Sequence, residues 1–289
     1  MTELLQPTAP PATAAPMLIG LLDGRLVPAD QPLLRPDDAG VVRGDGVFET
    51  TLVVSGVPRD LDEHLTRMSR SAAMTELELP PAADWRRGIA AVLDGWTGGD
   101  MVLRLIATRG PEHGRPTCYV TGSGVSASAV AQRSAGIRVL LLDRGFTGSA
   151  AVASPWLLAG AKTLSYSINM AALRYAAAHD ADDVIFVGAD GTVLEAPTAT
   201  VVVARGRTLT TPPADGVLAG ITVDRLFAAA AAAGWDTDRR PLLPDDLRSA
   251  EGVWLASSVR LLAPVISIDG VALPPATATA ELLGLLDCP

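Results

Sequence analysis

The chain has 289 residues, of which 48% are hydrophobic, and its 23 basic and 32 acidic side chains give a formal net charge of −9. A chain of this length can form roughly two domains with a buried core, which excludes general disorder and a fold that needs a metal or disulfide staple. The acidic balance without a basic run excludes nucleic-acid binding, and no stretch approaches the ~20 apolar residues of a membrane span. Two distant cysteines, Cys118 and Cys288, indicate free thiols in a reducing cytoplasm.

The first half of the chain predicts an α+β domain over residues 17–122. Residues 1–16 are rich in Pro, Ala and Thr and lack the features of a signal peptide, so we expect a disordered leader there. Periods of two and of 3.6 residues define the elements after this leader. They are a strand, turn and strand from Met17 with the turn at Asp23-Gly24, a hairpin over 47–60 with its turn at Ser55-Gly56, helices over 61–76 and 83–94, and strands over 101–108 and 117–122.

The second half predicts another domain, over residues 136–289. Residues 123–135 are small and polar, which is typical of a linker between domains. The elements expected after the linker are a strand over 137–143, a helix over 164–179, four short strands over 181–212, a helix over 221–233, strands over 252–256 and 263–267, and a short C-terminal helix.

Only one of the 23 basic residues is a lysine, Lys162. A genome that favours Arg and Ala codons explains why lysine is rare here, but not why one remains. Lys162 lies just before the helix predicted over 164–179, among apolar and small residues. Such surroundings lower the pKa of an amine from about 10.4, and a neutral amine is what a Schiff-base lysine needs. The alternative is a lysine that extends from the start of a helix to the surface.

Other segments supply partners for a reactive lysine. Glu195 ends a predicted apolar strand, Gly220-Ile221-Thr222 opens a helix whose N–H groups can bind an anion, and Ser258 follows another apolar strand. Arg67 lies on the helix predicted over 61–76. A buried amine, a lone carboxylate, an arginine and a helix N-terminus are the parts needed to hold the aldehyde, the ring nitrogen and the phosphate of pyridoxal phosphate.

Three other motifs predict no site. Gly44-Asp45-Gly46 precedes a strand and not a helix, so it is no phosphate loop. The histidines lack metal-binding spacing, so no metal is expected. Gly122-Ser123-Gly124 lacks the pattern of a hydrolase nucleophile elbow.

From about Met17 to Val265 the sequence resembles the fold-type IV pyridoxal-phosphate enzymes, the class IV aminotransferase family, and among them most closely the 4-amino-4-deoxychorismate lyases. The order and spacing of the matching segments carry this resemblance. These segments are RGDGVFET (43–50), DEHLTRM (62–68), AKTLSYSINMAALRYA (161–176), DGTVLEAPTATVVV (190–203), GVLAGITVDRL (216–226) and SSVRLLAPV (257–265).

The resemblance implies a two-domain fold of α+β and α/β character, with pyridoxal 5'-phosphate between the domains and a homodimer as the assembly. It implies that Lys162 forms the internal aldimine and moves the substrate proton, and that Glu195 pairs with the pyridine nitrogen. Tyr166 falls where the family often has an aromatic residue near a cofactor oxygen, and ordinary core packing is the alternative for it. The residues implied for the phosphate are Arg67, Ile221, Thr222 and Ser258.

The chain departs from the family pattern at three positions. Many members have Asn where this chain has Ser165 and Thr200, and many have Arg where it has Val223. The first two changes bear on hydrogen bonds around the cofactor, and the third removes a charge beside the phosphate helix.

The reactions of the family differ in the step after the substrate proton is removed. The SSVRLLAPV segment favours 4-amino-4-deoxychorismate lyase, which forms 4-aminobenzoate, a folate precursor, and pyruvate. Arg104 and Arg43 are candidates to bind the two substrate carboxylates, whereas Arg109 and Arg115 are expected to be solvated surface residues. The same arginines would suit a D-amino-acid or branched-chain aminotransferase, or an enzyme with both activities. A catalytically silent binding protein is a further alternative, against which the retained Lys162 argues.

Overall fold

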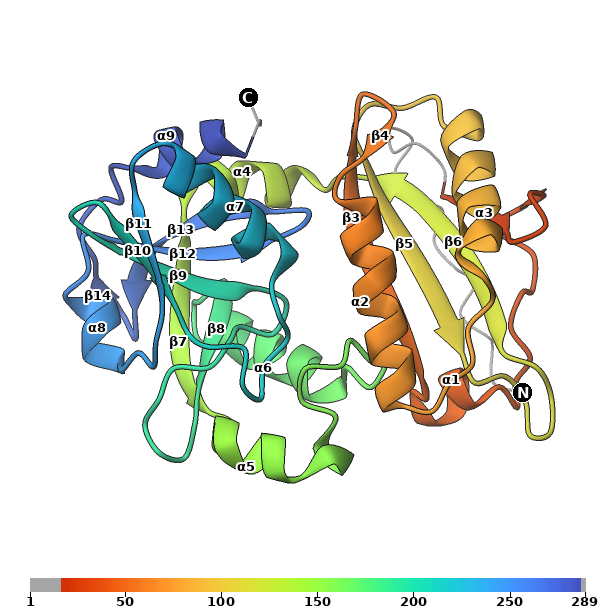
Figure 1. The fold of residues 1–289 in the computed structure, drawn as a ribbon, viewed down its shortest axis with the longest axis horizontal. Helices are drawn as coiled ribbons and strands as arrows, with labels where there is room; N and C mark the ends of the chain where they lie inside the picture. Colours follow the sequence, from red (N-terminus) through yellow and green to blue (C-terminus); the bar gives the residue numbers. More distant parts are fainter. Residues whose placement is uncertain (1–16, 287–289) are drawn as a thin grey trace, which may run out of the picture.

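The computed structural model describes residues 17–286, and these form two β-sheets that lie side by side (Figure 1). The predicted leader and Cys288 lie outside the described residues. Among the helices within this range, none is long and apolar enough to cross a bilayer.

The first sheet is antiparallel and has the strand order β2-β1-β6-β5-β3-β4. Its strands are β1 (Leu18–Leu21), β2 (Leu26–Val27), β3 (Gly46–Val54), β4 (Val57–Pro58), β5 (Met101–Thr108) and β6 (Thr117–Gly124). Helices α2 (Leu61–Met74) and α3 (Ala82–Gly95) cover one face, where Leu103, Leu105 and Trp85 are buried in a shared core. Because strand side chains alternate between faces, the residues between these core positions point from the opposite face. Every predicted element of this half is confirmed, within two residues at each end.

The chain crosses to the second sheet through helix α4 (Ala127–Ala135), which lies between the two sheets in Figure 1. The linker predicted over 123–135 is therefore mostly helical, with the Ser126 side chain capping its N-terminus. Arg133 of this helix donates a hydrogen bond to the carbonyl oxygen of Val259, at 2.9 Å. The domain boundaries themselves stay a prediction.

The second sheet is mixed, with the strand order β11-β10-β9-β12-β13-β7-β8 and β14 paired to β13. Its strands are β7 (Ile137–Asp143), β8 (Asp183–Val187), β9 (Thr200–Arg205), β10 (Thr208–Thr211), β11 (Asp236–Arg239), β12 (Gly252–Ser257), β13 (Leu261–Ile268) and β14 (Val271–Ala272). The helices around it are α5 (Gly148–Ala153), the 3₁₀ turn η1 (Pro155–Leu157), α6 (Ser167–Ala178), α7 (Ile221–Ala232), α8 (Pro244–Arg248) and α9 (Thr279–Leu285). Strand residues alternate between two cores: Trp254 packs with α7 and α9, and its neighbour Leu255 packs with α8 on the other face.

The structure corrects the prediction of four strands over 181–212. It contains three, β8, β9 and β10, and Glu195 lies in the irregular segment between β8 and β9. That segment still pairs locally with β8, because Phe186 N–H donates to the Glu195 carbonyl at 2.8 Å and Leu194 N–H donates to Phe186 at 2.9 Å. Apart from α4, the elements that were not predicted (α1, Ala39–Arg43, with α5, η1, α8, β11 and β14) are all six residues or shorter, too short for a periodic pattern.

The two halves contact each other directly. Leu52, on β3 of the first sheet, is fully buried in the core formed by α7 and the second sheet. Asp60, just before α2, forms an ion pair of 2.7 Å with Arg225 of α7. The space where the candidate residues meet is therefore bounded by both halves.

Candidate active site

Lys162 lies in the segment between η1 and α6, and its main chain is held by the other half of the molecule. Its N–H donates to Ser71 Oγ of α2 at 3.0 Å, and its carbonyl accepts from Phe48 N–H of β3 at 3.0 Å. Its Nζ lies 3.4 Å from Tyr166 Oη and 4.4 Å from the centre of the Phe48 ring. Burial lowers the pKa of Lys162 to about 8, and the positive charges of Arg67 and Arg104 act in the same direction against the opposing effect of Glu49.

This pKa predicts how the reactivity of Lys162 changes with pH. Only the neutral amine is nucleophilic, so at pH 7 about one-tenth of the Lys162 amines can react, and the labelling rate should rise with a midpoint near pH 8. The rate of trinitrophenylation, followed on the peptide that contains Lys162, measures this directly. In urea the same peptide should titrate near pH 10.4. An unchanged midpoint on unfolding would contradict the burial of the amine.

Tyr166 lies at the N-terminal boundary of α6, four residues after Lys162. Its ring meets the Phe48 ring edge-on, with centres 5.2 Å apart. Burial raises the pKa of Tyr166 to about 12, so the hydroxyl keeps its proton and faces the amine. The side chain is half-buried beside Lys162 and does not belong to a hydrophobic core.

Glu195 presents a half-buried carboxyl group to the same space. One of its oxygens accepts a hydrogen bond from Leu218 N–H at 3.1 Å, and the other accepts none from residues 17–286. Burial raises the pKa of Glu195 to about 7, although the Leu218 N–H and the charges of Arg144 and Lys162 oppose that rise. A nearby cationic group would therefore convert this carboxyl to its ionised form.

Asn169 fixes the loop that carries Glu195. Its side-chain amide, on α6, donates to the Pro197 carbonyl at 2.6 Å. The helix after Lys162 and the loop around Glu195 are thus tied together.

Arg67 is buried on α2 and makes three hydrogen bonds. Its Nε and Nη2 bind the two carboxylate oxygens of Glu49 at 2.7 and 2.8 Å, and its Nη1 donates to the Ala219 carbonyl at 2.7 Å. This last contact places the guanidinium at the chain segment that enters α7.

Sequence reasoning missed Glu49 and His64, which surround Arg67. The His64 ring binds Glu49 through Nδ1 at 2.7 Å and lies 3.3 Å from Ser258 Oγ through Nε2. Two signals were present: an acidic residue at an inward position of an apolar strand, and a histidine three residues before Arg67, on the same helix face.

The N-terminus of α7 supplies backbone donors. No side chain caps this end, so the first N–H groups of the helix carry its positive partial charge. Ile221 and Thr222, the first two residues of the helix, are both buried. A side chain at Gly220 would place a Cβ 2.4 Å from Thr200 Oγ1, so the loop can approach β9 only with glycine there. Thr200, one of the departures from the family pattern, thus contacts this turn.

The predicted arginines divide into two groups. Arg104 is exposed on β5 and points from the face opposite α2 and α3, since its neighbours Leu103 and Leu105 are in the core under those helices. Arg43 is exposed in the last turn of α1, beside Gly44, whose carbonyl binds Ser165 Oγ at 3.1 Å. Arg109, in contrast, binds Asp45 at 2.7 Å and two carbonyls at the end of α2, and Arg115 is exposed.

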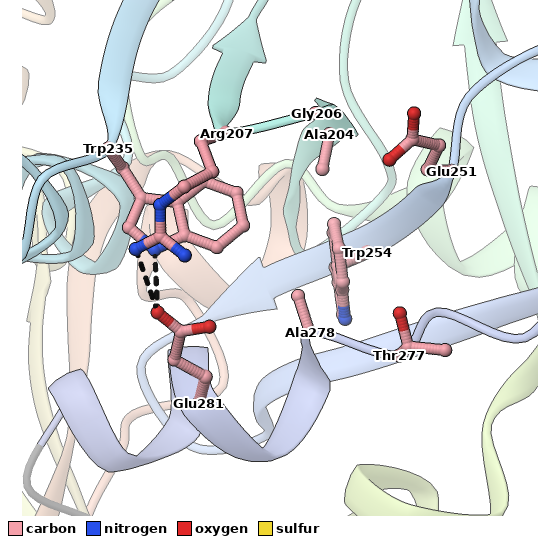
Figure 2. Close-up of a pocket in the computed structure, with 9 residues that line it drawn as sticks. All are labelled: Ala204, Gly206, Arg207, Trp235, Glu251, Trp254, Thr277, Ala278 and Glu281. Carbon is pink, nitrogen blue, oxygen red and sulfur yellow. Dashed lines mark hydrogen bonds and ion pairs between the residues drawn. The ribbon is translucent and has the colours of Figure 1, made fainter.

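A separate surface pocket of about 230 Å³ lies elsewhere on the second half (Figure 2). Three of its polar side chains contact one another: Glu281 of α9 accepts hydrogen bonds from Arg207 at 3.1 Å and from Trp235 at 2.9 Å, while Arg207 stacks on the Trp235 ring. None of the candidate residues lines this pocket. These contacts attach α9 to the sheet.

The family model for amino-transferase class IV matches residues 46–268. The chain belongs to the class IV aminotransferase family. A relative in Mycobacterium tuberculosis, the bifunctional aminodeoxychorismate lyase / D-amino acid transaminase, is 43% identical over 281 residues, covering 93% of this chain and 97% of the relative.

Two solved structures confirm the fold-type IV architecture of this class IV aminotransferase family member. The pyridoxal-phosphate-bound form of a hypothetical aminotransferase from Mycobacterium tuberculosis superposes with a TM-score of 0.91 at 43% identity, covering 94% of this chain and 97% of that one. A fold IV transaminase from Curtobacterium pusillum superposes with a TM-score of 0.86 at 42% identity, covering 93% and 96%.

Proposed function

We propose that this family member binds pyridoxal 5'-phosphate between its two halves, with the aldehyde on Lys162. The observation that carries the proposal is the convergence of a half-buried amine with a pKa of about 8 and a half-buried carboxyl with a pKa of about 7, each within electrostatic range of the other and of Arg67. Arg67, Ser258, Thr222 and the first N–H groups of α7, including that of Ile221, suit a phosphate. The pyridoxal-phosphate-bound structure named above supports the same choice.

In this proposal each side chain has one task. The bound cofactor supplies an electron sink for the carbanion at Cα of an amino substrate. Lys162, once neutral, removes the Cα proton and returns it, and Tyr166 Oη holds the amine in position through their hydrogen bond. Glu195 would keep a proton on the ring nitrogen of the bound cofactor, because its carboxylate favours the protonated form of a neighbouring base.

We propose further that the enzyme is a 4-amino-4-deoxychorismate lyase, which forms 4-aminobenzoate and pyruvate, and that D-amino-acid transamination is the second candidate. Both activities appear in the name of the Mycobacterium tuberculosis relative. Arg104 supports a substrate with carboxylates away from the reacting carbon, because it is exposed on the sheet face opposite α2 and α3, lowers the pKa of Lys162 through its charge, and makes no ion pair or hydrogen bond with residues 17–286. Arg43, next in the chain to Gly44, whose carbonyl accepts a hydrogen bond from Ser165, is a second candidate for such a carboxylate.

Two assays on the same preparation test these reactions. With 4-amino-4-deoxychorismate we expect 4-aminobenzoate and pyruvate in equal amounts, and with D-alanine and 2-oxoglutarate we expect slower pyruvate release. The Lys162→Ala protein is the matched blank for both. Transamination without any 4-aminobenzoate would replace the first assignment by the second. A protein that takes up no pyridoxal phosphate would leave the catalytically silent binding protein as the remaining alternative.

We also propose that two copies form a homodimer through the face around α5, η1 and α6. Large apolar side chains are exposed there: Trp156 at 76% and Ile168 at 60%, with Val152, Leu157 and Met170 nearby in the chain. Exposed apolar patches of this kind mark interaction surfaces. The same segments flank Lys162, so the partner subunit would adjoin the cofactor site.

The substitution Trp156→Glu should shift the protein from dimer to monomer, since it replaces the most exposed of these apolar side chains with a charge. Sedimentation velocity at micromolar concentration measures the change. Val271→Glu, at an exposed apolar position on β14, is the control and should leave the mass unchanged. A dimer that persists in Trp156→Glu would exclude this face.

A further inference from the structure

A chain of buried polar contacts connects two candidate phosphate ligands that come from different halves of the molecule. Glu49 is fully buried on β3 and accepts hydrogen bonds from Arg67 through both of its oxygens. His64 is also buried and binds the same carboxylate through Nδ1 at 2.7 Å. Its other nitrogen, Nε2, lies 3.3 Å from Ser258 Oγ, in the turn after β12. Glu49 therefore contacts Arg67 directly and Ser258 only through His64.

The directions of these hydrogen bonds follow from the chemistry of the groups. The pKa of Glu49 is about 2, because hydrogen bonds from Arg67 and His64 outweigh the effect of burial, so its carboxylate is ionised and can only accept. Nδ1 of His64 therefore carries a proton. When Nε2 also carries one, it donates to Ser258 Oγ, and the Ser258 hydroxyl is free to donate outward. When Nε2 is bare, the hydroxyl donates to it and presents only lone pairs.

We propose that His64 is a positioning residue that orients the Ser258 hydroxyl toward an anion at the N-terminus of α7. An anion beside Ser258 favours the arrangement in which that hydroxyl donates outward, and the contact of Nδ1 with Glu49 holds the ring so that Nε2 faces Ser258 Oγ. His64 touches neither the anion nor the reacting atoms. The inference rests on the proposed function, because it takes the cofactor phosphate as the anion.

A double-mutant cycle tests the proposal through binding and not turnover. The amide of Asn occupies the place of Nδ1, so His64→Asn keeps the contact with Glu49 and loses the one with Ser258. The amide of Gln occupies the place of Nε2, so His64→Gln keeps the contact with Ser258. Dissociation constants for pyridoxal phosphate and for pyridoxal, which lacks the phosphate, are measured by visible absorbance. The proteins are the wild type, His64→Asn, His64→Gln, Ser258→Ala and His64→Asn/Ser258→Ala, each checked for folding by thermal unfolding.

We expect His64→Asn and Ser258→Ala each to weaken pyridoxal phosphate binding about tenfold, the size of one hydrogen bond to a charged group. The double variant should be no weaker than the weaker single one, His64→Gln should retain most of the affinity, and pyridoxal binding should change less than about twofold throughout. Additive losses in the double variant, or an equal loss for pyridoxal, would overturn the proposal.

Two further outcomes keep the test decisive. If His64→Asn does not fold, the His64→Gln protein replaces it: wild-type affinity that is lost only when Ser258→Ala is added supports the proposal, and independent losses overturn it. A wild type that binds no pyridoxal phosphate defeats the proposed function itself. Normal binding by the wild type with additive variants defeats only the role of His64.

Discussion

Replacing Lys162 with arginine is expected to abolish turnover while leaving the protein folded. A guanidinium has a pKa above about 12 and stays protonated, so it can neither bond an aldehyde readily nor accept the substrate proton. The amine it replaces has a pKa of about 8 and lies between Tyr166 and the Phe48 ring, where a half-buried side chain of similar length can be accommodated. The other 22 basic residues are all arginines, so this is the one position where the chemistry excludes the residue that the chain otherwise uses.

Three measurements check this expectation. Lys162→Arg should show no product formation, no covalent cofactor after borohydride reduction, and a circular dichroism spectrum like that of the wild type. Arg70→Lys is the matched control, because it adds a second lysine at an exposed position of α2. It should keep full activity, and borohydride should still modify only the peptide with Lys162. Substantial turnover by Lys162→Arg would show that the lone lysine has no catalytic role.

The substitution Glu49→Ala should lower the free energy of unfolding at pH 7 by about 3–5 kcal/mol, the usual cost of removing one partner of a buried ion pair. It leaves Arg67 and His64 buried without their common carboxylate. Urea unfolding measures the loss. Glu63→Ala, an exposed residue on the same helix as Arg67, should change the stability by less than about 0.5 kcal/mol.

The lowered pKa of Glu49 predicts how this loss of stability depends on pH. Hydrogen bonds from Arg67 and His64 overcome the opposite effect of burial and lower the pKa of Glu49 from 4.5 to about 2 in the folded protein. A carboxyl with a lowered folded pKa stabilises the fold above its unfolded pKa and loses that effect as the pH falls through its folded pKa. The wild type and Glu49→Ala should therefore differ most above pH 4.5 and converge toward pH 2. A difference that stays constant across this range would mean that Glu49 acts by packing and not by charge.

The sequence predicted the residues of the candidate site better than the contacts that hold them. Lys162 and Glu195 were identifiable because a charged group in an apolar segment is rare. The structure brings both close enough to Arg67 for its charge to affect their pKa values. Glu49 and His64 were missed because the contacts between them form only when α2 packs on β3, and local periodicity does not predict that packing. The assigned roles of all these residues stay predictions until the variants are measured.

The helices and strands also divide into those that a local pattern predicts and those that depend on contacts distant in the sequence. Long elements such as α2 and β5 were predicted to within two residues, because an amphipathic period extends over several turns or alternations. The four residues of β11 are all exposed and pair only with β10, so no hydrophobic pattern marks them. The loop around Glu195 was predicted as a strand because it is apolar, but its backbone pairs with β8 and with other loops and does not extend the sheet.

The main-chain bonds of Lys162 have a consequence for how the enzyme can change during evolution. Its N–H and its carbonyl are both bound by the first half of the chain, although the residue belongs to the second. A displacement of about 1 Å between the halves would move the amine by the same amount, enough to lower a rate substantially. The two halves therefore cannot be exchanged independently between related enzymes. A chimaera must preserve the hydrogen bonds of Lys162 to Ser71 and Phe48 if it is to be active with any substrate.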